Sequence, residues 1–216
     1  HGEAYNVDGR IDSEALSAEG VYLKGFNVAA TVAGTNANYE ANGNAVAELL
    51  TFEDFRIEFP KLAGNVRGTG FDFRWVGELQ AVAAKSKSLS IVGLFVSDAV
   101  AEYKDQQLTA SGGNGRAQRF SIADTEFSNL NARDITVSQR NGGTQINSTG
   151  ATAGSMKTPD YGLEGLAGRN LRVGASGDRT TVELDGLTAK GATLKNNKAA
   201  NLRADKFALT DTPGGT

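Results

Sequence analysis

The residues of this chain that could carry out chemistry are few and far apart. His1 is the only histidine and there is no cysteine, so schemes in which an imidazole activates a thiol or a hydroxyl are not expected. Asp8 and Asp12 enclose Gly9 with a spacing that partly matches a calcium-binding loop, but the further oxygen ligands and the closing glutamate are missing. A zinc site would have to be built almost entirely from carboxylates, which is rare. The sequence therefore predicts no metal site and no cofactor.

The other acidic pairs do not change this expectation. Glu53 and Asp54 are adjacent, and a glycosidase or polysaccharide lyase could use two carboxylates brought together from distant positions. Such enzymes usually line a cleft with aromatic residues, whereas this chain has 7% aromatics and a single tryptophan. That residue, Trp75, ends the segment "GFDFRW" and is expected in the core or at its rim. We predict a protein that is not an enzyme and has no catalytic residues.

Composition and charge narrow the class of partner. The 216 residues carry a net charge of −3 with a pI of about 5.3, and basic residues occur singly among acids, so no nucleic-acid partner is expected. No run approaches the ~18 apolar residues of a membrane-spanning helix. The absence of cysteine favours a periplasmic or cell-envelope location, with an extracellular location as the alternative.

The apolar positions keep a rhythm of five residues. In residues 187–211, apolar or small residues fall at offsets 0, 2, 5 and 7, and residues 79–103 and 120–137 repeat the pattern. Offsets 0 and 2 share one face of a strand, but a further step of three would put the next pair on the opposite face of a flat strand. The chain must therefore bend, bulge or turn a corner between the pairs, as in curved sheets, β-helices and flattened β-rolls.

Segments rich in asparagine and glycine are expected to join these strands as antiparallel hairpins. They are "NANYEANGN", "YKDQQ", "ASGGNGR", "QRNGGTQ", "GASGDR" and "LKNNK". We predict an all-β protein with repeats of roughly 15 to 21 residues that vary in length. Residues 1–20 form an N-terminal segment, either disordered or with a short helix that Asp12 or Ser13 would cap and Gly20 would end. Residues 21–211 form a single β-repeat domain, and residues 212–216 form a tail.

One segment resembles a known family. The stretch "VELDGLTAKGATLKNNKAANLRADKFALT" has the order strand, glycine, strand, polar turn, "LRAD" and hydrophobic alternation. It resembles the repeating unit of the OstA-like lipopolysaccharide-transport proteins of the periplasm. The resemblance is strongest over residues 120–211, and the first 60 residues match poorly. The matching pieces are "LRADKFAL" (202–209), "LNARDITV" (130–137), "LAGRNLRV" (166–173) and "VRGTGFDF" (66–73).

The resemblance implies a fold and a function. The fold would be a β-taco or β-jellyroll, in which elongated, twisted antiparallel sheets with solenoid-like repeats form a V-shaped groove. The groove would shield the acyl chains of a lipid or glycolipid such as lipopolysaccharide. Open sheet edges would join the protein to further copies or to related envelope proteins. The candidates for the groove wall are Phe71, Phe73, Leu89, Ile91, Leu94, Val96, Phe127, Ile135, Val137, Leu171, Val173, Leu194, Phe207 and Leu209.

Two alternatives remain at this stage. The same apolar residues could form a closed core between two sheets, because small residues on one ladder let sheets approach closely or leave space for a ligand. The fold would then be a β-helix or β-solenoid, and the chain a structural segment of a surface adhesin, filament or secreted exoprotein. The two hypotheses differ in whether the interior is filled by the protein's own side chains.

Overall fold

The chain folds almost entirely into β-strands. The structure, a computed structural model, describes residues 4–18, 20–52, 55–70, 72–87, 89–104, 107–122, 124–140, 143–176, 179–194 and 197–211. These ranges contain no helix, so the all-β prediction is confirmed. The strands are β1 (Ala4–Ala18), β2 (Val21–Thr35), β3 (Asn38–Val46), β4 (Leu49–Phe52), β5 (Phe55–Glu58), β6 (Lys61–Thr69), β7 (Asp72–Lys85), β8 (Leu89–Lys104), β9 (Gln107–Ile122), β10 (Thr125–Arg140), β11 (Gly143–Lys157), β12 (Tyr161–Ser176), β13 (Arg179–Leu194) and β14 (Asn197–Asp211).

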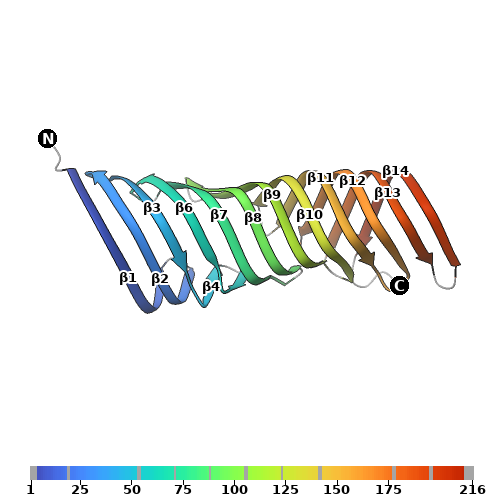
Figure 1. The fold of residues 1–216 in the computed structure, drawn as a ribbon, viewed down its shortest axis with the longest axis horizontal. Helices are drawn as coiled ribbons and strands as arrows, with labels where there is room; N and C mark the ends of the chain where they lie inside the picture. The colour runs from blue at the N-terminus through green and yellow to red at the C-terminus, as the bar shows by residue number, and fades with distance from the viewer. Residues whose placement is uncertain are drawn as a thin grey trace.

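The strands form one antiparallel meander in chain order (Figure 1). β3 and β4 both pair with β2, and β5 and β6 both pair with β7, so the pairings of these six strands close into a ring. The two interruptions lie side by side. The backbone N–H of Ala47 donates to the carbonyl of Pro60 (3.1 Å), and that of Phe59 donates to the carbonyl of Glu48 (2.9 Å). Each interrupted pair therefore acts as one long strand with a corner, and the prediction of antiparallel pairing is confirmed.

The N-terminal segment is a strand, so the option of a short helix near residues 12–20 is wrong. β1 pairs with β2 along its length, from Ala4 opposite Thr35 to Ala18 opposite Val21. Its apolar residues Val7 and Ile11 lie opposite apolar residues of β2. This cross-strand pairing outweighs the local helix preference of "DSEALSAEG".

The strand repeat is more regular than the sequence analysis predicted. With β3 and β4 counted as one strand, and β5 and β6 as another, strands begin at positions 4, 21, 38, 55, 72 and 89, which is a constant interval. The later strands begin at positions 89, 107, 125, 143, 161, 179 and 197, and this interval is also constant but longer by one residue. The variation in length is therefore a single change of one residue at β8.

Left-handed residues mark the three-residue step of the rhythm on alternate strands. Gly25, Phe59 and Gly93 have positive φ angles and are evenly spaced, one hairpin apart. Asn129, Gly165 and Asn201 continue the series at the slightly longer hairpin interval of the second half. Gly93 falls in the three-residue step between two apolar residues, at positions 91 and 94. The corner that the rhythm required is therefore present, and it keeps both apolar pairs on the inner face.

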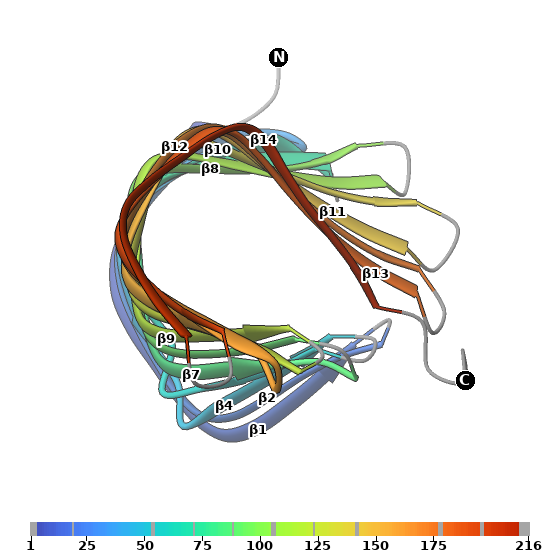
Figure 2. The same ribbon diagram turned by 90° about the vertical axis from the view of Figure 1, so that its right-hand side faces the viewer.

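In the later half, β8, β10 and β12 each have a second corner. Asp98, Asp134 and Asn170 also have positive φ angles, and each lies five residues after a first corner. With two such corners on β8, β10 and β12, and with the strands between them following the same bend, the sheet curves round an interior, as the end-on view shows (Figure 2). The largest cluster of buried apolar side chains comes from β8 to β13, where the second corner is present. Its members are Leu89, Ala117, Phe120, Ile122, Phe127, Ala151, Ala153, Met156, Leu163, Leu166, Leu171, Val173, Val182, Leu184, Leu187 and Ala189.

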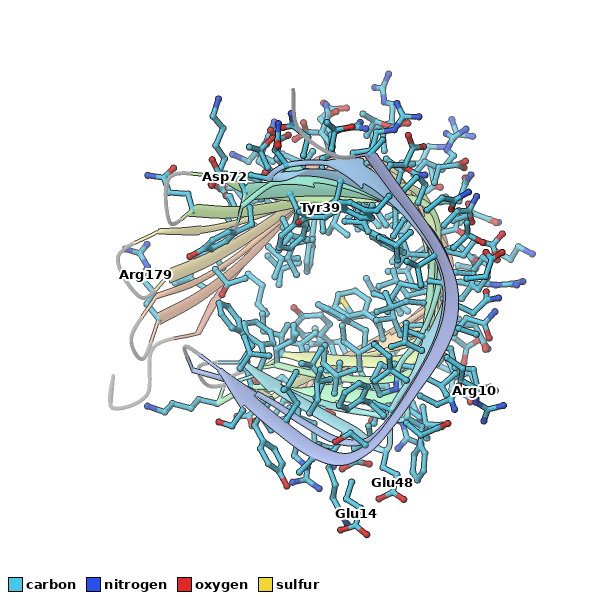
Figure 3. All side chains as sticks on the ribbon, turned by 90° about the vertical axis from the view of Figure 1, so that its left-hand side faces the viewer. Arg10, Glu14, Tyr39, Glu48, Asp72 and Arg179 are labelled. Atoms are coloured by element: carbon cyan, nitrogen blue, oxygen red, sulfur yellow. The ribbon has the colours of Figure 1, made fainter. Side chains whose placement is uncertain are left out.

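The two faces of the sheet differ in polarity. Side chains on the inner face are almost all hydrocarbon, whereas charged side chains such as Arg10, Glu14 and Glu48 project from the outer face (Figure 3). The ion pairs of the described residues are between exposed or half-buried side chains, for example Arg67 with Glu40 at 2.8 Å. Because exposed pairs contribute about 0–1 kcal/mol each, the fold depends mainly on burial along the inner face.

In the first half of the chain, a row of glycines lies at the part of the strands where the later strands have their second corner. Gly43, Gly64 and Gly77 lie opposite one another on successive strands. A Cβ atom built on Gly64 would lie 2.1 Å from the carbonyl oxygen of Val76, and one on Gly77 would lie 1.9 Å from that of Ala63. Backbone atoms cannot move aside as a flexible side chain can. These positions therefore accept only glycine.

We expect Gly77→Ala to lower the free energy of unfolding by about 2–3 kcal/mol, because the new methyl collides with backbone. Gly9→Ala is the matched control. Gly9 lies in the same row on β1, with no atom within 4 Å of its Cβ position, and the change should stay within about 0.5 kcal/mol. Urea denaturation followed by circular dichroism measures both, and equal effects would contradict the role of the row.

The corners give a second prediction. Asn129 has φ 50°, and a β-branched residue is strained in that conformation, so Asn129→Val should lower the free energy of unfolding by about 1–2 kcal/mol. Asn131→Val, at an exposed strand position two residues later, should change it by less than about 0.5 kcal/mol. If thermal and urea unfolding show no difference between the two variants, the left-handed corner is not what shapes β10.

Candidate functional site, an apolar cavity beneath β9

The main candidate site is a cavity that exists because β9 lacks large side chains. The inner-face positions in the middle of β9 are Ala110, Gly112, Gly115 and Ala117, so nothing larger than a methyl group projects inward there. The neighbouring strands carry Val96, Ile135 and other branched residues. These residues do not fill the space, and a cavity of about 250 Å³ remains.

The glycines of β9 also decide how the neighbouring side chains lie. A Cβ on Gly112 would lie 2.3 Å from Cγ1 of Val96, and one on Gly115 would lie 2.3 Å from Cδ1 of Ile135. The two branched side chains therefore lean across the strand between them. They form the part of the cavity wall nearest to β9.

Polar chemistry is nearly absent from the cavity. The wall includes Ser148, but its hydroxyl is hydrogen-bonded to the carbonyls of Arg133 (2.7 Å) and Gly150 (2.8 Å). Ser111 and Arg116 contribute through their backbone, because their side chains are exposed on the outer face. Buried side-chain polar atoms of the described residues all have hydrogen-bond partners. The cavity therefore suits hydrocarbon and offers no polar group to hold a charged or hydroxylated ligand.

Half of the predicted groove residues meet at this cavity. Seven line it, namely Ile91, Leu94, Val96, Ile135, Val137, Leu171 and Val173. Leu89 and Phe127 belong to the buried cluster, and Phe207 and Leu209 pack against it. Phe73 stacks on Tyr103, with ring centroids 5.9 Å apart. Leu194 is 54% exposed, and Phe71 lies outside the described residues.

Sequence reasoning missed the residues that create the space. The segment "ASGGNGR" was predicted to be a turn, but residues 110–116 lie in the middle of β9, so that prediction is wrong. Most of "NANYEANGN" is likewise strand β3, since only Asn36 and Ala37 form a turn. These predictions failed because glycine is typical of turns, whereas on β9 it opens the inner face. The constant interval between strand starts would have located residue 110 within a strand.

Two rims of the sheet meet over the cavity. Leu89 and Ile122, at the ends of β8 and β9, enclose a small space together with Ile146 and Val173 of β11 and β12. The pairings of β8 and β9 run to β7, β8, β9 and β10, and not to β11 or β12. Side-chain contacts therefore close this seam without backbone hydrogen bonds, so it can part at lower cost than a paired edge.

The acidic residues considered for metal binding face outward and have protein partners. Asp8 accepts a hydrogen bond from Thr31 (2.5 Å), and Asp12 accepts hydrogen bonds from Asn27 and from Arg10 (3.0 Å to Nε). Glu53 and Asp54 lie outside the described residues. Within the part of the chain that the structure describes, no three His, Cys, Asp or Glu side chains gather where they could hold a metal ion. Nor do these residues include a helix able to cross a membrane.

Trp75 lines the cavity from β7, in agreement with its expected place in the core or at its rim. The chain matches no protein-family model, no curated protein and no solved structure.

The outer face near the N-terminal half carries one perturbed carboxylate. Arg67 and Asn65 donate to Glu40 (2.8 and 2.9 Å), and these hydrogen bonds, that of Arg67 first, hold the pKa of Glu40 below its ordinary value. A lowered pKa stabilises the fold above the ordinary carboxyl pKa, and this contribution is lost as the pH falls through the lowered value.

Removing the arginine should reverse this shift. Arg67→Ala should raise the pKa of Glu40 towards that of a free glutamate, as followed by NMR titration of the carboxyl carbon. Arg119→Ala, which removes a different ion pair at Glu126, should leave the Glu40 pKa unchanged. An unchanged pKa in the first variant would show that Arg67 does not control the titration of Glu40.

Proposed function

We propose that this protein binds the hydrocarbon chain of an amphiphilic lipid in the cavity beneath β9. The observation that carries the proposal is a cavity of about 250 Å³ whose one inward-facing hydroxyl, that of Ser148, is already hydrogen-bonded. Each methylene group moved from water into such a space contributes about 0.8 kcal/mol. Binding therefore needs no nucleophile, metal ion or cofactor.

The size of the cavity bears on which lipid fits. Pockets for drug-sized ligands span about 300–1,000 Å³, so the space of about 250 Å³ suits part of one acyl chain. A lipid with several chains, such as a lipopolysaccharide, would require the seam between Leu89 and Ile146 to part. The proposed role is to shield such chains in the periplasm or elsewhere in the cell envelope, in a fold of the β-taco or β-jellyroll kind.

The edges of the sheet support a bridging role. In the described part of the chain, β1 pairs only with β2, and β14 pairs only with β13. Unpaired strand edges accept a strand from another protein. On β1, Val7 is 56% and Ile11 60% exposed, so a docked strand would also bury inner-face side chains. A further copy or a related envelope protein would extend the apolar interior in this way.

The second candidate is a structural β-solenoid segment of a surface adhesin, filament or secreted exoprotein. It is favoured by the regular strand spacing and by the well-filled interior of β10 to β13, where Met156 and Val182 are each only 1% exposed. A structural role does not account for the space beneath β9, so lipid binding is preferred.

Ala132→Phe tests the proposal by filling the cavity. Ala132 lines the space from β10, and a benzyl group there should abolish lipid co-purification while the protein stays folded. Thr136→Phe is the control, because Thr136 lies on the exposed face of the same strand. Native mass spectrometry and lipid extraction, on protein purified from a membrane-containing lysate, measure bound lipid in each.

The proposal requires lipid on the unmodified protein and on Thr136→Phe but not on Ala132→Phe, with the same β circular dichroism spectrum throughout. Lipid-free unmodified protein, together with end-to-end oligomers that grow with concentration, would favour the structural segment instead. Equal lipid on both variants would place the lipid outside the cavity.

A further inference from the structure

A row of aromatic residues and glycines runs along one rim of the inner face, apart from the acyl-chain cavity. Tyr5 of β1 lies opposite Gly34 of β2, which lies opposite Tyr39 of β3. Tyr39 lies opposite Gly68 of β6, and Gly68 lies opposite Phe73 of β7. From β1 to β7 the row therefore carries an aromatic ring on every second strand, with a glycine between, and it ends where Phe73 stacks on Tyr103 of β8.

The glycines let the tyrosine rings lie across the neighbouring strand. A Cβ on Gly34 would lie 2.3 Å from Oη and 2.5 Å from Cζ of Tyr5. A Cβ on Gly68 would lie 2.4 Å from Oη and 2.5 Å from Cζ of Tyr39. Each ring thus covers the backbone of a glycine, and any larger residue at those two positions would displace the ring.

The rings border a hollow that differs in character from the cavity beneath β9. It is a wide, open hollow of about 760 Å³ at the strand ends, and its wall includes Tyr5 and Tyr39 with Thr35, Asn38 and Thr69, and also Glu40 and Arg67 of the outer face. Tyr5 is 40% exposed, and Figure 3 shows Tyr39 on the inner side of the sheet. Aromatic faces beside phenol hydroxyls and strand backbone suit a ligand that is apolar on one face and hydroxylated at its edge.

The spacing of the rings identifies the class of ligand. Adjacent strands lie about 4.7–4.9 Å apart, so rings on every second strand repeat at about 9–10 Å. This distance is close to the length of a disaccharide unit in an extended β-linked glycan. In such a chain every second sugar presents the same face, whose C–H groups stack on aromatic rings.

We propose that the rim formed by Tyr5 and Tyr39 binds the pyranose rings of a glycan, with alternate sugars stacked on these two rings, and that the Phe73–Tyr103 pair marks the end of the row. The rim runs next to the cavity, because Trp75, which lines the cavity, follows Phe73 by two residues on the same face of β7. The glycan is therefore either the saccharide head of a glycolipid or a free polysaccharide. The rim can bind sugar whether or not the cavity binds lipid.

Isothermal titration calorimetry with cellohexaose tests the rim alone. Tyr39→Ala should weaken binding about five- to tenfold through loss of one stacked ring. Tyr39→Phe, which keeps the ring, should change it by about twofold at most. Tyr22→Ala is the matched control, since Tyr22 is 37% exposed on β2 and belongs to the opposite face, and it should have no effect.

Two detergents with the same alkyl chain distinguish the sources of the sugar. Dodecyl cellobioside carries a β-linked disaccharide head, and a polyoxyethylene dodecyl ether does not. If the rim serves a glycolipid, the cellobioside should bind more tightly than the ether, and Tyr39→Ala should remove the difference. Cellohexaose binding without a preference between the detergents would support a free polysaccharide.

The proposal is overturned if cellohexaose does not bind and the two detergents bind equally. It is also overturned if Tyr22→Ala weakens binding as much as Tyr39→Ala, or if Tyr39→Ala keeps full affinity. Failure of the acyl-chain proposal is a separate result. It would be shown if neither detergent binds, or if both detergents bind Ala132→Phe with the same affinity as the unmodified protein. Circular dichroism of each variant confirms that the sheet is intact, and Tyr39→Phe covers the case in which Tyr39→Ala does not fold.

Discussion

The structure depends on one constraint, namely that a long strand must curve and still keep its apolar side chains on the same face. A flat strand alternates faces at every residue, so it cannot curve round an interior without a local change of backbone. On alternate strands the change is a residue in the left-handed region, as at Gly93 of β8 and Asn129 of β10, whereas β9 and β11 keep the same rhythm without a positive φ angle. Glycine and asparagine adopt that region at low cost. At each corner, successive inward-facing side chains are three residues apart, whereas in a flat strand they are two apart. The five-residue apolar rhythm, the hairpin repeat and the closed interior all follow from this longer step.

One added residue per strand divides the molecule into two parts. Up to β7 the strands follow one another at the shorter interval with a single left-handed corner per hairpin, and the glycine row takes the place of the second. From β8 the interval is longer by one residue, and Asp98 and its equivalents add the second corner. The buried cluster begins with Leu89, the first residue of β8. The well-filled core and the exposed aromatic rim therefore lie in different parts of a single continuous sheet.

Much of this could be predicted from the sequence because the apolar rhythm reports directly on which side chains face inward. The ladders through Leu89 and Leu94, and through Ile91 and Val96, lie on the inner face as expected. The strand β1 could not be predicted in the same way, because its local sequence favours helix and only the facing apolar residues of β2 determine its conformation. The length of the repeat was also hard to find in the sequence. The apolar positions spaced five residues apart continue across the turns, and they hide the longer interval between the starts of successive strands. The cavity could not be predicted from apolar residues, since it is defined by side chains that are missing.

The space beneath β9 argues against a purely structural interior. Side chains that border an unfilled apolar space lack packing partners, so such a space lowers stability unless something fills it. Larger side chains at Ala110 or Ala117 would reduce this cost, and neither residue has the positive φ angle that would restrict it to a small side chain. On β13 the positions that correspond to Ala110, Gly112 and Gly115 carry Val182, Leu184 and Leu187, which are 1%, 7% and 6% exposed. The same architecture therefore accommodates bulky side chains elsewhere, and the run of alanine and glycine on β9 is consistent with a space kept for a ligand whose binding restores the buried apolar contact.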